Sequence, residues 1–217
     1  MLVDAFPVGP LGCNCAIVAD PSTNKSIVID PGGDARKILD RIARHSFQVE
    51  AILHTHGHID HVGATADLQK HFPVDSLLHP DDRFILDMLV VQSTFVGMRA
   101  PERPKLGADL VDHAVLRFGG LEVTVIHTPG HSPGSVSFLV QHGTERILFS
   151  GDTLFQGGIG RSDLWGGDSA ALSRSIRDRL YALEDDLQVI PGHGGRTTIG
   201  EEKRSNPFVR PRASGAI

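Results

Sequence analysis

The run His56-Gly57-His58-Ile59-Asp60-His61 constrains this chain more than any other feature of its sequence. It places four titratable side chains within six positions. If these groups were buried without a partner ion, the desolvation cost would be heavy, because each would lose its hydrogen bonds to water. A solvated loop would avoid that cost, but histidine and aspartate recur in a similar setting at three later points of the chain. The run therefore predicts a metal centre.

Those three later points follow apolar runs that are typical of β-strands. His131 lies in the turn Pro129-Gly130-His131, Asp152 follows Gly151, and His193 lies in the turn Pro191-Gly192-His193. Strand ends are rigid and the loops after them are accessible, which is where ligands and catalytic groups are commonly mounted. We therefore expect four strand ends to deliver side chains to one centre.

The spacing within the first run suggests how the ligands divide. Alternate residues of an extended segment point the same way, so His56, His58 and Asp60 can converge while His61 serves a second ion nearby. A carboxylate with two oxygens can bridge two ions and leave room for a shared water. The predicted sets are His56, His58 and His131 for one ion, Asp60, His61 and His193 for the other, and Asp152 as the bridge.

The expected cofactors are two divalent metal ions. A donor set made only of His and Asp suits Zn, Fe and Mn, and Zn is the metal that we expect first. Of the other histidines, His127 is expected to support the turn that holds His131, and His54 to be structural or supporting. The remaining histidines lack a partner at a suitable spacing and are interpreted as ordinary: His45, His71, His79, His113 and His142.

Composition narrows the class of protein. The chain has 217 residues, 40% hydrophobic and 22% charged, as in an ordinary soluble globular protein, and residues 1–217 are expected to form one domain. A net charge of -5 argues against a nucleic-acid partner. There is no apolar run of the roughly 18 residues that a membrane span needs, and the first residues do not resemble a signal peptide. Together with only two cysteines, Cys13 and Cys15, this favours a cytoplasmic setting.

The apolar pattern predicts an α/β fold with two similar halves. Expected strands cover residues 2–8, 16–19, 26–29, 49–53, 76–79, 122–127, 135–140, 146–150 and 188–190. Expected helices cover residues 35–44 with Asp34 as N-cap, 62–71, 81–90 and 169–183, while 93–109 is expected to be a long surface loop. Two strand-rich halves with added helices suggest two sheets packed face to face with helices outside.

The motifs Thr55-His56-x-His58-x-Asp60-His61, Pro129-Gly130-His131, Gly151-Asp152 and Pro191-Gly192-His193 resemble those of the metallo-β-lactamase superfamily. The likeness spans essentially the whole chain, and Asp30-Pro31-Gly32 adds to it. It implies an αββα sandwich, two mixed sheets with helices on the outer faces, with a hydrolytic metal site at one edge.

Within that superfamily the sequence resembles the compact bacterial glyoxalase II-like group, which implies hydrolysis of thioesters of the S-lactoylglutathione type. Residues 151–155, 158–164 and 197–201 carry this likeness. Arg161 and Asp163 stand where longer members place a Lys and a Tyr that hold glutathione. Arg161 is expected to bind a substrate carboxylate, and the alternative is a salt bridge with Asp163 or Asp168. The carrier thiol therefore stays open.

The expected reaction is attack of a hydroxide held between the two ions on the acyl carbon, with Asp60 orienting it. The thiolate leaves without a dedicated acid, because thiols have a pKa near 8.5. The partner is a small-molecule thioester, and the sequence sets no oligomeric state. The alternatives are a mononuclear iron persulfide dioxygenase, a lactone or phosphodiester hydrolase of the same superfamily, and a module that binds metal or a signal molecule without chemistry.

Overall fold

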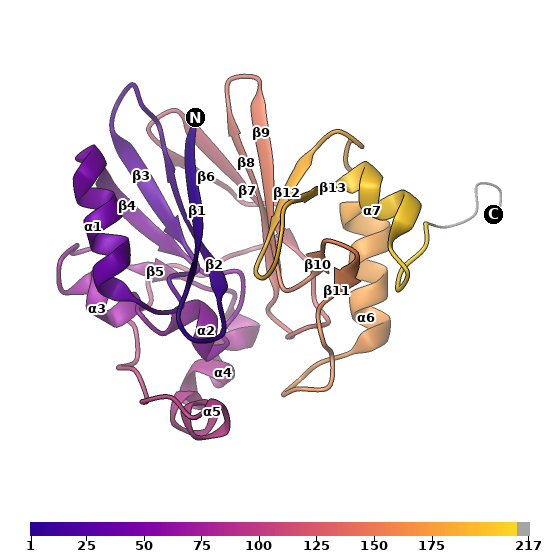
Figure 1. Cartoon of the computed structure of the whole chain (residues 1–217), viewed down its shortest axis with the longest axis horizontal. Coiled ribbons are helices and arrows are strands. Elements are labelled where there is room, and N and C mark those ends of the chain that lie inside the picture. Colours follow the sequence, from indigo (N-terminus) through magenta and orange to yellow (C-terminus); the bar gives the residue numbers. More distant parts are fainter. Residues whose placement is uncertain (212–217) are drawn as a thin grey trace.

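The computed structural model describes residues 1–211 and contains two sheets packed against each other (Figure 1). The first has the order β1-β2-β3-β4-β5 and the second the order β13-β12-β9-β8-β7-β6. The strands of the first sheet are β1 (Leu2–Val8), β2 (Cys13–Ala19), β3 (Lys25–Ile29), β4 (Gln48–Leu53) and β5 (Ser76–Leu77). Those of the second are β6 (Val115–Phe118), β7 (Leu121–His127), β8 (Val136–His142), β9 (Glu145–Gly151), β12 (Gln188–Pro191) and β13 (Thr197–Thr198).

Both sheets are mixed. In the first, β3 runs parallel to β4 and β4 to β5, while the other pairs are antiparallel. In the second, β12 runs parallel to β9 and the remaining neighbours are antiparallel. A separate hairpin pairs β10 (Leu154–Phe155) with β11 (Gly158–Ile159). Parallel neighbours place their carboxyl ends at the same edge of a sheet, which is what the predicted centre requires.

The core lies in three layers. Val18 of β2 and Phe138 of β8 belong to the cluster between the sheets. Ile17, the residue before Val18, belongs to the outer cluster together with Ile38 of a helix that covers the first sheet. Successive strand residues point to opposite faces, so the buried run of β2 serves both layers. Leu172 and Ile176 cover the outer face of the second sheet. The predicted αββα sandwich is confirmed.

Helices cover the two outer faces and one edge. Figure 1 shows α1 and α3 outside the first sheet, α6 and α7 outside the second, and α2, α4 and α5 together at the lower edge. The bounds are α1 (Ala35–His45), α2 (Ile59–Val62), α3 (Thr65–Gln69), η1 (Pro80–Asp82), α4 (Arg83–Asp87), α5 (Leu89–Val96), α6 (Ser169–Arg174), the π-helical η2 (Ser175–Leu180) and α7 (Ile199–Ser205). No helix in the described range 1–211 has the length and apolar character for crossing a bilayer.

Several predicted elements differ from the structure. The helix expected over residues 62–71 is interrupted after Val62, where α2 ends, and resumes at Thr65 as α3. Between them the chain passes close to Gly32, and a Cβ on Gly63 would lie 2.6 Å from the carbonyl oxygen of Gly32. Asp34 is the N-cap residue of α1 as predicted, with φ 50°, but its side chain makes no capping hydrogen bond; its carboxylate accepts a hydrogen bond from the amide of Gly9 at 3.0 Å. The strand β6 was not predicted. That residues 1–217 form one domain stays a prediction.

The prediction of a surface loop over residues 93–109 is wrong for residues 93–96, which are helical. Helix α5 continues to Val96 and ends at Gly97, which has φ 67°. Its apolar side chains are mostly exposed, whereas the polar Gln92 and Ser93 are buried. The Gln92 amide accepts a hydrogen bond from the amide of Ile59 and donates one to the carbonyl of Ile85. A helix that buries its polar face gives no apolar periodicity to detect.

Candidate metal centre

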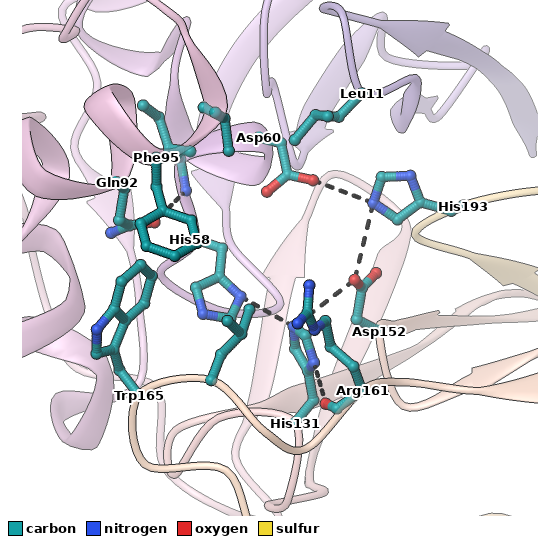
Figure 2. Close-up of a pocket in the computed structure, with 13 residues that line it drawn as sticks. Leu11, His58, Asp60, Gln92, Phe95, His131, Asp152, Arg161, Trp165 and His193 are labelled. Carbon is teal, nitrogen blue, oxygen red and sulfur yellow. Dashed lines mark hydrogen bonds and ion pairs between the residues drawn. The ribbon is translucent and has the colours of Figure 1, made fainter.

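The predicted ligands meet at the edge where the two sheets join. His56 and His58 follow β4, and Asp60 and His61 lie in the short helix α2. The second sheet supplies the other side chains from the loops after its strands: His131 after β7, Asp152 after β9 and His193 after β12. Figure 2 shows Asp60, His131, Asp152 and His193 directed toward a shared space beside His58.

Three imidazoles form the first group. His131 Nε2 lies 2.9 Å from His58 Nδ1 and 3.2 Å from His56 Nε2. Burial and the neighbouring imidazoles lower the pKa of His58 to about 3 and hold that of His56 well below its usual value. Both rings are therefore neutral at pH 7, with lone pairs directed at one point. This is the arrangement that a divalent cation requires of histidine ligands.

The second group combines carboxylates with two imidazoles whose pKa is raised: burial opposes protonation of His61 and His193, but the acidic groups around them outweigh it. His193 Nε2 lies 3.1 Å from Asp60 Oδ2, and His61 Nε2 lies 3.4 Å from Asp152 Oδ1. The other oxygen of Asp152 lies 3.6 Å from His131 Nε2, so this carboxylate stands between the two groups as predicted for a bridge. Burial opposes ionisation of both aspartates, but the surrounding histidines outweigh it and lower the pKa of each carboxyl.

Two buried atoms lack a partner at this point. Among the described residues, His61 Nε2 and Asp152 Oδ1 have no hydrogen-bond partner although both are covered. Buried polar atoms are almost always paired, since an unpaired one costs about 1–3 kcal/mol. A cation between them would satisfy both. The donor chemistry, the neutral imidazoles and these unpaired atoms all fit metal binding, and the division of ligands between two ions stays a prediction.

Asp30 holds the second group in place, and it was not among the predicted site residues. Its Oδ2 lies 3.0 Å from His61 Nδ1 and accepts a 2.6 Å hydrogen bond from the hydroxyl of Thr55. The same hydroxyl lies 3.1 Å from His56 Nδ1. A histidine ligand is commonly oriented through its other ring nitrogen by a carboxylate, which fixes its tautomer. The only sequence signal was the strand-ending Asp30-Pro31-Gly32.

Asp82 is a second carboxylate that the sequence did not single out. It is fully buried at the start of α4 and accepts hydrogen bonds from the amides of Gly57 and Gly134 and from the hydroxyl of Ser132. Gly57 separates the first two histidines of the run, and the other two residues follow His131. Asp82 thus ties the two loops of the first group together. Burial raises its pKa.

Gly192 and Cys13 pack closely against two of the predicted ligands. A Cβ on Gly192 would lie 2.1 Å from Asp152 Oδ1, so only glycine allows the loop after β12 to pass this carboxylate. Cys13 Sγ lies 3.4 Å from His61 Nδ1 behind the centre, and burial raises the pKa of its thiol to about 12. This keeps Cys13 protonated, in agreement with a packing role.

Arg161 lies on the wall of the cavity in front of the centre (Figure 2). Its guanidinium makes two hydrogen bonds to Asp163, at 2.8 and 2.9 Å, so the salt bridge weighed as the alternative is present with this partner. Asp168 caps α6 instead. The backbone carbonyl of Arg161 lies 2.7 Å from His131 Nδ1 and orients that ring. Binding of substrate by the Arg161 side chain stays a prediction.

The other histidines largely follow the predictions. His54 is buried and lies 3.3 Å from the hydroxyl of Thr65. His127 Nε2 lies 2.9 Å from the carbonyl of Pro133, close to the His131 turn that it was expected to support. His79, which was interpreted as ordinary, stacks its ring on that of His127 at 4.3 Å between centroids. The two residues are too distant in sequence for spacing to show this.

The comparisons with known proteins agree with this geometry. The model of the metallo-β-lactamase superfamily matches residues 8–193. The chain belongs to this superfamily. A curated relative, hydroxyacylglutathione hydrolase GloC of Haemophilus influenzae, is 39% identical over 98% of this chain and 100% of its own length.

Three solved structures are similar to this superfamily member. BLEG-1 B3 metallo-β-lactamase has a TM-score of 0.88 at 37% identity, covering 96% of this chain and 99% of its own. TTHA1623 in a di-iron-bound form has a TM-score of 0.85 at 37% identity, covering 95% and 100%. ETHE1 from Myxococcus xanthus has a TM-score of 0.78 at 25% identity, covering 95% and 84%.

Proposed function

We propose that this protein is a two-metal hydrolase of thioesters, of the S-lactoylglutathione type. The observation that carries the proposal is the position of Asp152 between the group of three imidazoles and a second group that contains Asp60 and His193. Similarity to hydroxyacylglutathione hydrolase GloC along its whole length supports the reaction class.

In this proposal His56, His58 and His131 would hold one ion, Asp60, His61 and His193 would hold the other, and Asp152 would be available to both. When bound, such ions supply a water of pKa about 7 and polarise the acyl carbonyl. Zn is the expected metal, with Fe or Mn as alternatives; the di-iron form of TTHA1623 shows that a similar chain can hold iron.

Asp60 has the role of positioning the attacking water. Its carboxylate is ionised and reaches the cavity, so it can accept a hydrogen bond from the water and orient a lone pair toward the acyl carbon. A thiolate leaves unaided, because its pKa is near 8.5. This agrees with the place of the only tyrosine, Tyr181, whose hydroxyl donates to backbone carbonyls of Glu202 and Val209.

The test is a panel of thioesters of glutathione, coenzyme A and smaller thiols, measured on protein of known metal content. Asp60→Ala should lower kcat/KM by at least about 10²-fold, as loss of an acid–base group does. Asp87→Ala, which removes an exposed carboxylate of α4, is the matched control. The panel includes a β-lactam because BLEG-1 is a similar chain.

Two results would overturn the proposal. Full activity and full metal content in Asp60→Ala would exclude the role given to that carboxylate. One iron per chain, with oxygen uptake on a persulfide and no thioester turnover, would identify a dioxygenase instead.

A further inference from the structure

The cavity in front of the metal centre, about 290 Å³ in volume, has two unlike sides. Its floor consists of predicted ligands. One wall is apolar and is formed by Phe95, Val96, Leu164 and Trp165, which we call the apolar wall. Figure 2 shows Phe95 and Trp165 on the side of His58, away from Asp152 and His193. A cavity of this size holds one compact group beside the centre.

The aromatic rings of the apolar wall lie next to His58, a predicted metal ligand. The Trp165 ring lies 6.3 Å from that of His58 and 6.0 Å from that of Phe95, in edge-to-face geometry. Phe95 is 76% exposed, although a large apolar side chain gains free energy by leaving water. An exposed Phe95 beside a half-buried Trp165 at the rim of a cavity indicates a binding surface.

The apolar wall is held by buried contacts. Gln92, one turn before Phe95 in α5, is 2% exposed, and its amide joins α5 to Ile59 and to Ile85 through hydrogen bonds of 2.9 and 2.7 Å. Trp165 lies in a turn closed by a 2.8 Å hydrogen bond from the amide of Gly167 to the carbonyl of Leu164. The wall is therefore preformed, which reduces the ordering cost of binding.

This side of the cavity has few side chains that could bind a charged group of the substrate. Of its lining residues, Arg161 alone carries a cationic side chain of Lys or Arg type, and both hydrogen bonds of its guanidinium fork go to Asp163. The guanidinium holds the pKa of Asp163 at about 2, so the pair is charged and mutually neutralised at pH 7. Two of the five N–H donors of the guanidinium are thus directed at Asp163, whose charge offsets the attraction of Arg161 for a substrate carboxylate.

We infer that the apolar wall is a subsite for an uncharged aliphatic or aryl group of a few carbons, placed next to the scissile carbonyl of the substrate. The inference rests on the proposed function for the identity of that bond. The apolar group can belong to the acyl part or to the thiol part of the thioester, and the experiment separates the two.

Trp165 is the only tryptophan of the chain, so its fluorescence reports occupancy of the apolar wall without turnover. Straight-chain carboxylates and straight-chain alkylthiols of two to six carbons are titrated into metal-loaded protein. Affinity in one series should rise about two- to fourfold for each added methylene, as burial of a CH₂ group predicts. A rise in affinity with the carboxylates would assign the apolar wall to the acyl part of the substrate, and a rise with the alkylthiols would assign it to the thiol part.

Phe95→Ala is the test variant because it keeps the Trp165 reporter. It should abolish the dependence on chain length while binding of the two-carbon ligand is unchanged. Val91→Ala is the matched control, since Val91 is exposed on the same helix but does not line the cavity. With thioesters that carry a six-carbon chain on the part identified by the titration, Phe95→Ala should raise KM about tenfold, and it should leave KM of the two-carbon counterpart unchanged.

The two proposals fail in different ways. Affinity that is independent of chain length in both series, or a rise that Phe95→Ala leaves intact, would overturn the subsite whatever reaction is catalysed. A rise that Phe95→Ala abolishes, in a protein that hydrolyses no thioester, would support the subsite and overturn the proposed reaction.

Discussion

Both oxygens of the Asp30 carboxylate accept hydrogen bonds from Thr55, one from its amide at 2.8 Å and one from its hydroxyl at 2.6 Å. Asp30 is a single carboxylate 31 positions from His61, and only the fold brings its Oδ2 to within 3.0 Å of that ring. Its importance lies in contacts with Thr55 and His61 that no local pattern encodes.

Replacing Asp30 by Asn should weaken metal binding at His61. The amide carries no charge and can present its NH₂ group to Nδ1, which would favour the wrong tautomer of the ring. Loss of such a carboxylate costs about 10–100-fold in metal affinity. Calorimetric titration of metal-free protein should show this loss for one ion.

The control for this prediction is Asp34→Asn, in the same segment but bonded only to the amide of Gly9 among the described contacts. Equal affinity in wild type and Asp30→Asn would show that the carboxylate does not orient His61.

At the scale of elements, the positions of helices were easier to predict than the contacts made by the side chains at their ends. A helix was predicted from residue 81 onward, and α4 does begin at Arg83 after η1. The carboxylate of Asp82 makes no cap and turns toward the two loops that hold His56, His58 and His131. That direction depends on the approach of the loop after β7, which periodicity within one helix does not contain.

Asp82→Ala should destabilise the fold strongly. It would leave the buried amides of Gly57 and Gly134 without an acceptor, at about 1–3 kcal/mol each. We expect the free energy of unfolding, measured with urea, to fall by about 3 kcal/mol. Asp87→Ala, which breaks only an exposed ion pair with Arg103, should cost under about 1 kcal/mol. Similar losses in the two variants would contradict the role given to Asp82.

At the scale of the whole molecule, the duplicated element pattern suggested two sheets packed face to face, but the motifs were needed to single out this architecture among α/β folds and to indicate the edge that carries the centre. Periodicity identifies buried faces and says nothing of which strand ends adjoin. The metal centre takes ligands from both sheets, so its formation depends on their packing.

Metal removal should therefore lower the stability of the whole molecule. A ligand that binds only the folded state adds about 4 kcal/mol at a thousand times its dissociation constant. Chelation should move the urea midpoint to lower denaturant concentration, and added Zn should restore it. An unchanged midpoint in protein shown to lose its metal would mean that the centre contributes nothing to holding the sheets together.

Asp20 also links the two sheets, and its hydrogen bonds should make the stability of the fold depend on pH. Its carboxylate accepts hydrogen bonds from the hydroxyls of Ser22 and Thr23 and from the amide of Gly120 in the second sheet, and these lower its pKa. A lowered folded pKa gives stability above the unfolded value of about 3.9 that is lost as pH falls below it. Asp20→Asn should be less stable than wild type at pH 7.

The difference between wild type and Asp20→Asn should shrink in urea unfolding below about pH 4. Asp40→Asn, in an exposed pair with Arg36, should show almost no difference at any pH. A gap for Asp20→Asn that stays constant down to pH 2 would exclude this linkage.

The buried thiol beside His61 has a consequence for an enzyme that releases a thiol at each turnover. Disulfide exchange requires a thiolate that an outside sulfur can reach. Cys13 is fully covered, and burial raises its pKa to about 12, so it satisfies neither condition. Under the proposed reaction, a released thiol that becomes oxidised therefore finds no accessible sulfur at Cys13 to couple with, and the product does not inactivate the centre through this residue.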